Sequence, residues 1–546
     1  MTKFRSLTIL LGLLVAAPIG GPAAAQDLEL GVQTVRSPKE YLDLLEQARK
    51  LRAEGLPYEA VDRLAEVLSE GFEEQEYFGE AQFEMAKTLF QLGMYQSAYG
   101  QLERVVDTGP THKYYGEAID WLLKVHRAVP GDVLTLEKMA EYDPMLYPPE
   151  QANEIRFLVG QFHYTNDDLD QALESLGEVE QSAERPYLRA QYLIGVIHTR
   201  RNDAQPALEA FRNILRYARD VRTDDFVDDL VRKATLSLGR LFYTARQYSA
   251  AVRYYDEIDQ TDPAWLESLF EISWTYYQLG NFDRALGNLH TLNSPYFVNE
   301  YYPESLILQA VIDLKNCHFP QVVESVERFV ETYKPLKEEL EVQLKRTQAP
   351  NEFYYYLARL SRQDSQAALS NQLKRVINAA LQDKKLRRLL QYVVQLNREV
   401  GRIEEMKKAM TRQRGADYAT TMLGDLTAYR ELVISDAGEA ARGRLDRVRA
   451  ELTDLLSQAL RVKFETLRAQ RAMLNLQKTM TADQVDAQRA VSVARPPADE
   501  EHMYWPFEGE YWRDELGAYT YVVANRCLKR EQKSAPQPAP DAPPTP

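Results

Sequence analysis

The chain has 546 residues, of which 45% are hydrophobic and 27% are charged, and its formal net charge is -15 at pH 7. This apolar content is enough to bury a large core, so it excludes global disorder. The acidic balance argues against nucleic acid as the main partner, because phosphate binding needs clustered Lys and Arg. Two cysteines exclude a Cys-rich zinc site, an iron–sulfur cluster and a framework of several disulfides.

Residues 1–25 are typical of a secretory signal peptide. Lys3 and Arg5 precede an apolar run at 7–20, and the small residues at 23–25 predict cleavage before Gln26. The run is too short to span a bilayer, and an uncleaved membrane anchor is the alternative. No cysteine follows it, so we expect no lipid anchor. We therefore expect a periplasmic protein, with residues 26–39 as an N-terminal linker.

A pair of small residues twelve positions apart recurs between residues 40 and 340. The pairs are Ala48/Ala60, Ala86/Ala98, Gly160/Ala172, Gly195/Ala207, Gly239/Ala251 and Ser273/Ala285, with Ala310/Val322 as a larger variant. Two antiparallel helices approach closely only where neither Cβ is bulky, so each pair predicts a contact between helices. Apolar residues at i+3 and i+4 complete one helix face. With a degenerate pair at 114–142, the pattern predicts an all-α array of about eight helical pairs at 40–340.

The pattern resembles the tetratricopeptide repeat (TPR) family, whose 34-residue unit has this small-residue pairing and a closing proline. The best-matching units read LSLGRLFYTARQYSAAVRYYDEIDQTDP at 236–263 and LFEISWTYYQLGNFDRALGNL at 269–289. The resemblance implies a superhelix whose concave wall is lined by the first helix of each pair.

Carried over position by position, the resemblance places eleven residues on that concave wall. They are Phe157, Tyr164, Tyr192, Arg200, Lys233, Arg240, Tyr243, Phe270, Trp274, Tyr277 and Ile307. Tyr, Trp and Arg dominate binding hot spots, so we expect a groove that binds a protein partner. The alternative is that several of these side chains pack against neighbouring repeats.

Residues 341–495 are expected to be helical, and their charge is reversed. They carry 28 Lys and Arg against 18 Asp and Glu, whereas residues 26–340 carry 31 against 54. One interpretation is a basic arm presented to an acidic partner or to anionic envelope polymers. The other is a solvated helical surface on which Arg and Glu alternate.

A heptad seam runs through the same region and predicts a coiled-coil-like segment. Its members are Leu445, Val448, Leu452, Leu455, Ala459, Val462, Thr466, Ala469, Met473, Leu476 and Met480. The seam could be covered by the 373–413 region folding back, by a second copy in a homo-oligomer formed through 445–480, or by another protein. Helix breaks are expected at Gly401, Gly415, Gly424 and Gly438.

An aromatic and acidic segment at 496–530 contains Trp505, Phe507, Tyr511 and Trp512. It is expected to include a final helix at 511–526. It could cap the helical array, dock a partner, or supply paired carboxylates for glycoside hydrolysis. The cap is the preferred interpretation. The proline-rich tail at 531–546 is expected to be disordered.

The sequence contains no HExxH motif, no P-loop and no GxGxxG in a strand–helix context. Cys317-His318 lacks partners at metal-ligand spacing, and Cys317 is expected as a buried side chain on a repeat helix. A Cys317–Cys527 bridge is conceivable in an oxidising compartment. We therefore predict no enzyme activity, no cofactor and no metal site.

Together these features predict an exported, non-catalytic scaffold that binds other proteins, with no nucleic-acid partner and only indirect association with a membrane. The layout is similar to periplasmic TPR proteins of bacterial envelope machines, including gliding-motility complexes. An enzyme that cleaves cell-wall polymers is the alternative.

Overall fold

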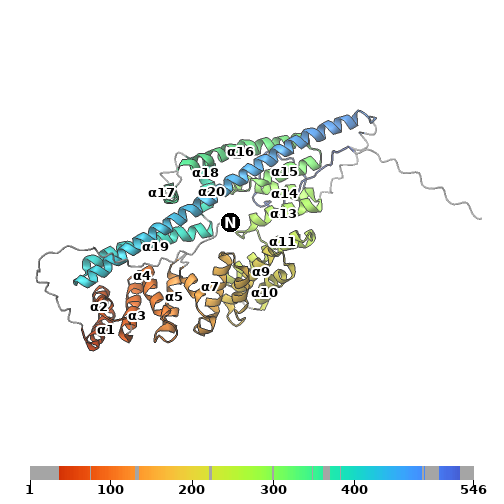
Figure 1. Ribbon diagram of the computed structural model, residues 1–546. Coiled ribbons are helices and arrows are strands. Elements are labelled where there is room, and N and C mark those ends of the chain that lie inside the picture. Colours follow the sequence, from red (N-terminus) through yellow and green to blue (C-terminus); the bar gives the residue numbers. More distant parts are fainter. Residues whose placement is uncertain are drawn as a thin grey trace, which may run out of the picture.

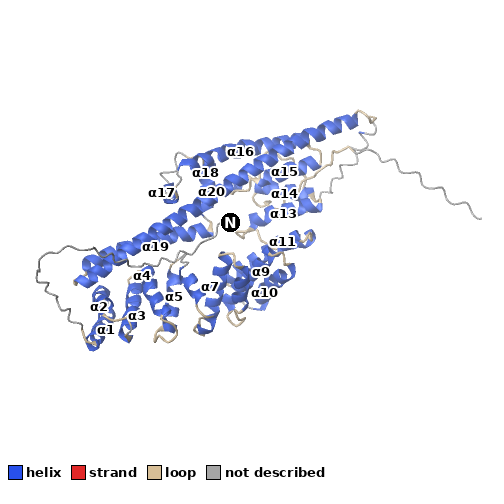
Figure 2. Cartoon of the chain, viewed as in Figure 1, coloured by secondary structure: helices blue, strands red, loops and turns tan. Residues whose placement is uncertain are grey.

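The computed structural model describes residues 36–73, 75–129, 134–220, 224–297, 300–346, 349–360, 369–381, 383–481, 485 and 503–528. The expected signal peptide, nearly all of the linker and the proline-rich tail lie outside these residues. The described residues contain helices and no strand (Figure 2), so the predicted all-α class is confirmed. Among them, no helix is both long enough and apolar enough to cross a bilayer.

The α-helices are α1 (Pro38–Ala53), α2 (Pro57–Glu70), α3 (Glu76–Gln91), α4 (Tyr95–Asp107), α5 (Tyr115–Ala128), α6 (Leu134–Glu141), α7 (Ala152–Thr165), α8 (Leu169–Gly177), α9 (Glu184–Arg200), α10 (Ala204–Asp220), α11 (Asp225–Thr244), α12 (Tyr248–Asp256), α13 (Trp265–Leu279), α14 (Phe282–Leu292), α15 (Glu304–Lys315), α16 (Phe319–Arg346), α17 (Pro350–Leu360), α18 (Asn371–Leu381), α19 (Lys384–Ala409) and α20 (Gln413–Gln477). Two 3₁₀ turns, η1 (Pro144–Leu146) and η2 (Pro295–Phe297), lie between pairs.

Helices α1 to α16 pack as successive pairs, each formed by an odd-numbered helix and the next even-numbered one. All fourteen small-residue positions predicted to mark the pair contacts are buried. A Cβ atom added at Gly160, Gly195 or Gly239 would lie 2.5–2.7 Å from the side chain of Leu176, Phe211 or Tyr255. The first small residue of a pair therefore faces the large residue four positions after the second one. This close packing produces a TPR-like array.

The turn inside seven of the pairs uses one backbone position with a positive φ, seven residues after the first small residue. These residues are Gly55, Gly93, Asp167, Asn202, Arg246, Gly280 and Cys317. A left-handed residue after the last turn ends a helix and reverses the chain. Cys317 therefore lies in the turn between α15 and α16 and not, as expected, on a helix.

The paired helices follow a curved path, and the 65-residue α20 crosses between the two ends of that path (Figure 1). Its first half packs on α19 and reaches α2 and α4, its middle packs on α17, and its second half packs on α15 and α16. At 1.5 Å per residue, α20 is roughly 100 Å long. It therefore joins the first and last pairs of the array directly.

The heptad seam of α20 is covered by the chain itself as far as Thr466. Leu445, Val448 and Leu452 pack in one cluster with residues of α16, α17, α18 and α19, and Leu455, Ala459 and Val462 pack in another with α15 and α16. The main partner is thus α16, and not the 373–413 region as a whole. The alternative of a homo-oligomer through 445–480 has no free seam at 445–466, because these side chains are already buried.

The four glycines expected to break helices lie inside helices. Gly401 is within α19, and Gly415, Gly424 and Gly438 are within α20. Two of them allow close contacts, since an added Cβ would lie 1.8 Å from Asp62 Oδ1 at Gly415 and 1.8 Å from the Pro350 carbonyl oxygen at Gly438. The observed break between α19 and α20 lies at 410–412.

A buried carboxylate fastens α19 to the second helical pair. Glu399 is fully buried and accepts hydrogen bonds from the backbone amides of Gln96 (3.0 Å) and Ser97 (2.8 Å) and from the Ser97 hydroxyl (2.8 Å). These groups lie at the N-terminus of α4, where unpaired amides and the helix dipole favour an anion. Burial raises the pKa of Glu399, although these hydrogen bonds oppose the shift.

The basic region also binds the acidic face of α2. Thr411 donates from its amide (3.1 Å) and hydroxyl (2.7 Å) to Asp62, and Arg412 pairs with Glu66. Arg414 pairs with Glu70 at 3.3 Å. Part of the basic region is therefore neutralised by the array of the same chain, an arrangement that neither interpretation of the charge reversal included.

The C-terminal segment at 503–528, called the strap below, contains no helix, so the expected helix at 511–526 is wrong. The strap runs along α14: Gly517 donates its amide to Thr291 Oγ1 (2.9 Å), and the Tyr521 amide donates to the Asp283 carbonyl (3.0 Å). Cys317 and Cys527 form a disulfide that fixes the end of the strap. The strap therefore covers the side of α14 and the turn between α15 and α16, in the last two repeats, rather than the end of the array.

Candidate partner-binding groove

The predicted concave-wall residues lie on α7, α9, α11, α13 and α15, the first helices of five successive pairs. Two of them are buried and cannot contact a partner in this conformation, Phe157 at 6% and Ile307 at 3% exposure. Phe157 belongs to the main core cluster, and Ile307 packs with the seam residues of α20. The long helix therefore covers the inner face of the last pair. The other nine residues are partly exposed.

Several of the rings also contact the neighbouring repeat. Phe270 lies 5.6 Å from Tyr302, and the Arg200 guanidinium lies 5.6 Å from the Tyr164 ring. Trp274 and Tyr277 meet edge to face at 5.7 Å within α13. These contacts fix the ring orientations, so the wall is an ordered aromatic surface.

The three predicted cations of the wall are each paired with a carboxylate of the chain. Arg200 binds Asp167 at 2.7 Å, and Lys233 binds Asp229. Arg240 contacts Glu271 and Glu267, both at 2.6 Å, and joins α11 to α13. Although burial opposes its charge, the bonds to Glu271 and Glu267 raise the pKa of Arg240. A partner therefore meets ion pairs here rather than free positive charge.

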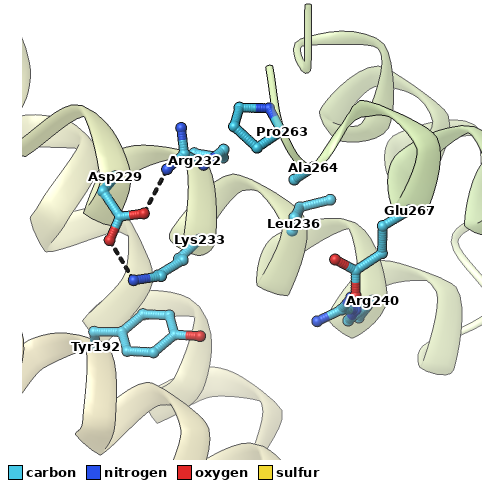
Figure 3. A pocket seen from close by; sticks show the side chains of 9 residues that line it. All are labelled: Tyr192, Asp229, Arg232, Lys233, Leu236, Arg240, Pro263, Ala264 and Glu267. Atoms are coloured by element: carbon cyan, nitrogen blue, oxygen red, sulfur yellow. Dashed lines mark hydrogen bonds and ion pairs between the residues drawn. The ribbon is translucent and has the colours of Figure 1, made fainter. Parts of the chain in front are cut away.

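A cavity of about 340 Å³ opens among α9, α11 and the start of α13 (Figure 3). Its lining residues are Tyr192, Asp229, Arg232, Lys233, Leu236, Arg240, Pro263, Ala264 and Glu267. It brings together three residues predicted from the sequence, Tyr192, Lys233 and Arg240. The five lining residues of α11 share one helix face because the last four lie three, four, seven and eleven positions after Asp229.

The cavity combines an apolar part with alternating donors and acceptors. Leu236, Pro263 and Ala264 supply the apolar surface. Asp229 accepts hydrogen bonds from both Lys233 and Arg232, and these bonds lower its pKa although burial opposes its ionisation. Figure 3 shows the Tyr192 ring beneath Lys233. This mixture suits an extended peptide, whose backbone presents both donors and acceptors and whose side chains need apolar contact.

Sequence reasoning missed the other six lining residues, which are Asp229, Arg232, Leu236, Pro263, Ala264 and Glu267. Asp229 follows from the helical spacing of Lys233, since it lies one turn before Lys233 on the same face, and Arg232 lies one turn after Asp229. Pro263 was identified only as the end of a repeat. Its position in the cavity wall depends on how α13 packs against α11, and no local sequence pattern indicates that packing.

The predicted docking residues of the strap form a second aromatic cluster. Trp505 stacks on Trp512 at 4.5 Å, and Phe507 meets Tyr511 at 5.2 Å. Phe507 and Tyr511 also pack on His290 of α14, whose pKa burial lowers to about 4. Phe507 is 47% exposed and Trp512 is 38% exposed, so parts of both rings face solvent.

Glu510 is one of the carboxylates of this segment that could serve in glycoside hydrolysis. Hydrogen bonds from backbone amides and from the Trp505 indole (2.6 Å) hold its pKa below the usual range. A general acid for this reaction needs a raised pKa, so the environment of Glu510 does not suit that role. Among the described residues, no group of three His, Cys, Asp or Glu side chains could hold a metal ion.

No protein-family model matches the chain, and no curated protein matches it. Among solved structures, it is similar to the apo form of the quorum sensor NprR from B. thuringiensis, at 14% identity and a TM-score of 0.26, over 71% of this chain and 97% of that one. It is also similar to yeast Tom70, at 12% identity and a TM-score of 0.21, over 72% and 96% of the two chains. These values are too low to transfer a function.

Proposed function

We propose that this protein is a non-catalytic scaffold that binds an extended polypeptide along the inner wall of its helical array. The observation that carries the proposal is the cavity at Tyr192, Lys233 and Arg240, together with the ordered rings of Trp274 and Tyr277 further along α13. Partly buried aromatic and Arg side chains beside an apolar surface are the features that dominate protein-binding sites.

We further propose that the scaffold acts in the periplasm, as part of an envelope complex that serves motility or envelope assembly. The N-terminal sequence at 1–25 supports export. The disulfide between Cys317 and Cys527 also supports an oxidising compartment, because such bonds are rare where thiols are kept reduced. The process itself is inferred only from the resemblance to envelope TPR proteins.

Capture of partners from envelope extracts by the mature chain tests the binding role. Replacing Trp274 and Tyr277 with alanine removes two large rings from the wall, and each anchor of this kind typically contributes about 2 kcal/mol or more to binding. We expect the double variant to lose captured polypeptides while keeping the helical circular dichroism of the parent. The matched control is Tyr254→Ala on α12, the second helix of its pair. Retained capture by the double variant would place the binding site elsewhere.

A further inference from the structure

The end of α20 carries an exposed apolar stripe on the side away from its buried seam. Leu460, Phe464, Leu467 and Leu474 are 63%, 61%, 57% and 51% exposed. Steps of four and three place them on one helix face. At about 100° per residue, that face lies roughly 130° around the helix from the seam formed by Leu455, Ala459, Val462 and Thr466. The stripe is therefore free while the seam is occupied.

The stripe continues onto a part of α20 that overhangs the rest of the molecule. The last buried residue is Thr466, whereas the helix ends at Gln477. This overhang is roughly 16 Å long at 1.5 Å per residue. In Figure 1 the blue end of α20 extends beyond the neighbouring helices. The length of the overhang is about twice the electrostatic screening length, which is about 8 Å at physiological ionic strength. The negative charge of the array is therefore largely screened at the end of the overhang.

The end of α20, including the overhang, is strongly basic, although the chain as a whole is acidic. Residues 460–478 hold the single acid Glu465 and five cations, which are Arg461, Lys463, Arg468, Arg471 and Lys478. Lys463 pairs with Glu327 at 3.0 Å. The other four cations make no ion pair with any residue that the structure describes. The Arg468 guanidinium lies 5.8 Å from the Phe464 ring, so charge and apolar surface adjoin.

We propose that this end of α20 binds the surface of an anionic lipid bilayer, independently of the groove. Exposed Leu and Phe would enter the boundary between headgroups and acyl chains, and the cations would contact lipid phosphates. Arg471 and Lys478 fall on the stripe itself. Beside a protein helix they would occupy seam positions and need buried acidic partners, whereas at a membrane their long side chains reach the headgroups. A second copy is disfavoured because it would bring the same unpaired cations.

Flotation of the full mature chain with lipid vesicles tests the proposal. We expect binding to vesicles of phosphatidylethanolamine with phosphatidylglycerol and little binding to pure phosphatidylcholine. Replacing Phe464 and Leu467 with Asn should weaken partitioning by about tenfold or more. Replacing Arg468 and Arg471 with Gln should weaken it by on the order of twentyfold, since each cation near an anionic surface contributes about fivefold.

The matched controls are Leu432→Asn, another exposed leucine of α20, and Arg447→Gln, an exposed arginine outside the stripe. Both should bind vesicles as the parent does, and all four variants should keep the parent's thermal midpoint because every position is exposed. Absence of binding to the anionic vesicles would overturn the proposal. So would equal losses in the controls, or binding that survives both stripe variants. A lipid-free oligomer that dissociates when Phe464 and Leu467 are replaced would assign the stripe to a second copy instead.

Discussion

Gly195 and Gly100 both lie inside helices, and their different surroundings make them a matched pair. A Cβ added at Gly195 would lie 2.5 Å from the Phe211 ring, whereas nothing lies within 4 Å of one added at Gly100. We expect Gly195→Ala to lower the stability of the array by about 1–3 kcal/mol through overpacking. Gly100→Ala should raise it by about 0.5–1 kcal/mol because alanine favours the helix. Urea unfolding followed by circular dichroism measures both, and a stable Gly195→Ala protein would contradict the packing argument.

His290 gives the strap a predicted pH dependence. Burial under the strap lowers the pKa of His290 from 6.5 to about 4. His290 therefore binds a proton at a higher pH when the strap is released than when the strap is docked. The contribution of His290 to docking is therefore complete above pH 6.5 and is lost as the pH falls towards 4. We expect the thermal unfolding midpoint of the parent to fall more between pH 7 and pH 5 than that of His290→Phe. The variant keeps an aromatic ring at this position but has no group that titrates. Equal losses would show that His290 is not the titrating group.

At the scale of elements, the sequence predicted correctly the helices whose contacting residues lie close along the chain. The small residues of each pair lie twelve positions apart, so their pattern contains the helix, the turn and the contact together. The strap has no such local pattern. Its amides donate to Asp283 and Thr291, more than 200 residues earlier, and its Gly509 and Gly517 have positive φ. A helix at 511–526 was predicted because these distant acceptors cannot be recognised from the sequence.

Two different substitutions should release the strap without unfolding the array. Cys527→Ser removes a link that closes 210 residues, for which the chain-entropy model gives about 5 kcal/mol as an upper value. Gly287→Ala leaves the disulfide intact but places a Cβ 1.7 Å from the Tyr519 carbonyl oxygen. In both we expect faster amide hydrogen exchange at 503–528 and little change in helical circular dichroism. Gly424→Ala, with open space around the added Cβ, is the control. Slow exchange in both variants would contradict this description of the strap.

At the scale of the whole molecule, the long-range closure by α19 and α20 could not be predicted from the sequence. Glu399 and Ser97 are 302 positions apart, and both are polar residues on the surfaces of their own helices. The charge reversal left open an acidic partner or a solvated surface for the basic region, and the structure instead places part of that region against α2 of the same chain. The closure also changes the groove, because α20 buries Ile307. The inner wall available to a guest therefore extends from α7 to α13.

Site-specific photo-crosslinking in intact cells tests the central claim, occupation of this wall by a polypeptide, most directly. A photoreactive residue at Tyr192 would lie in the cavity, and one at Arg253, exposed on α12, would lie outside it. We predict a discrete polypeptide adduct from position 192 that position 253 does not give. Addition of Trp274→Ala and Tyr277→Ala should abolish that adduct. Adducts from position 253 alone, or an adduct from position 192 that survives loss of both rings, would contradict the account.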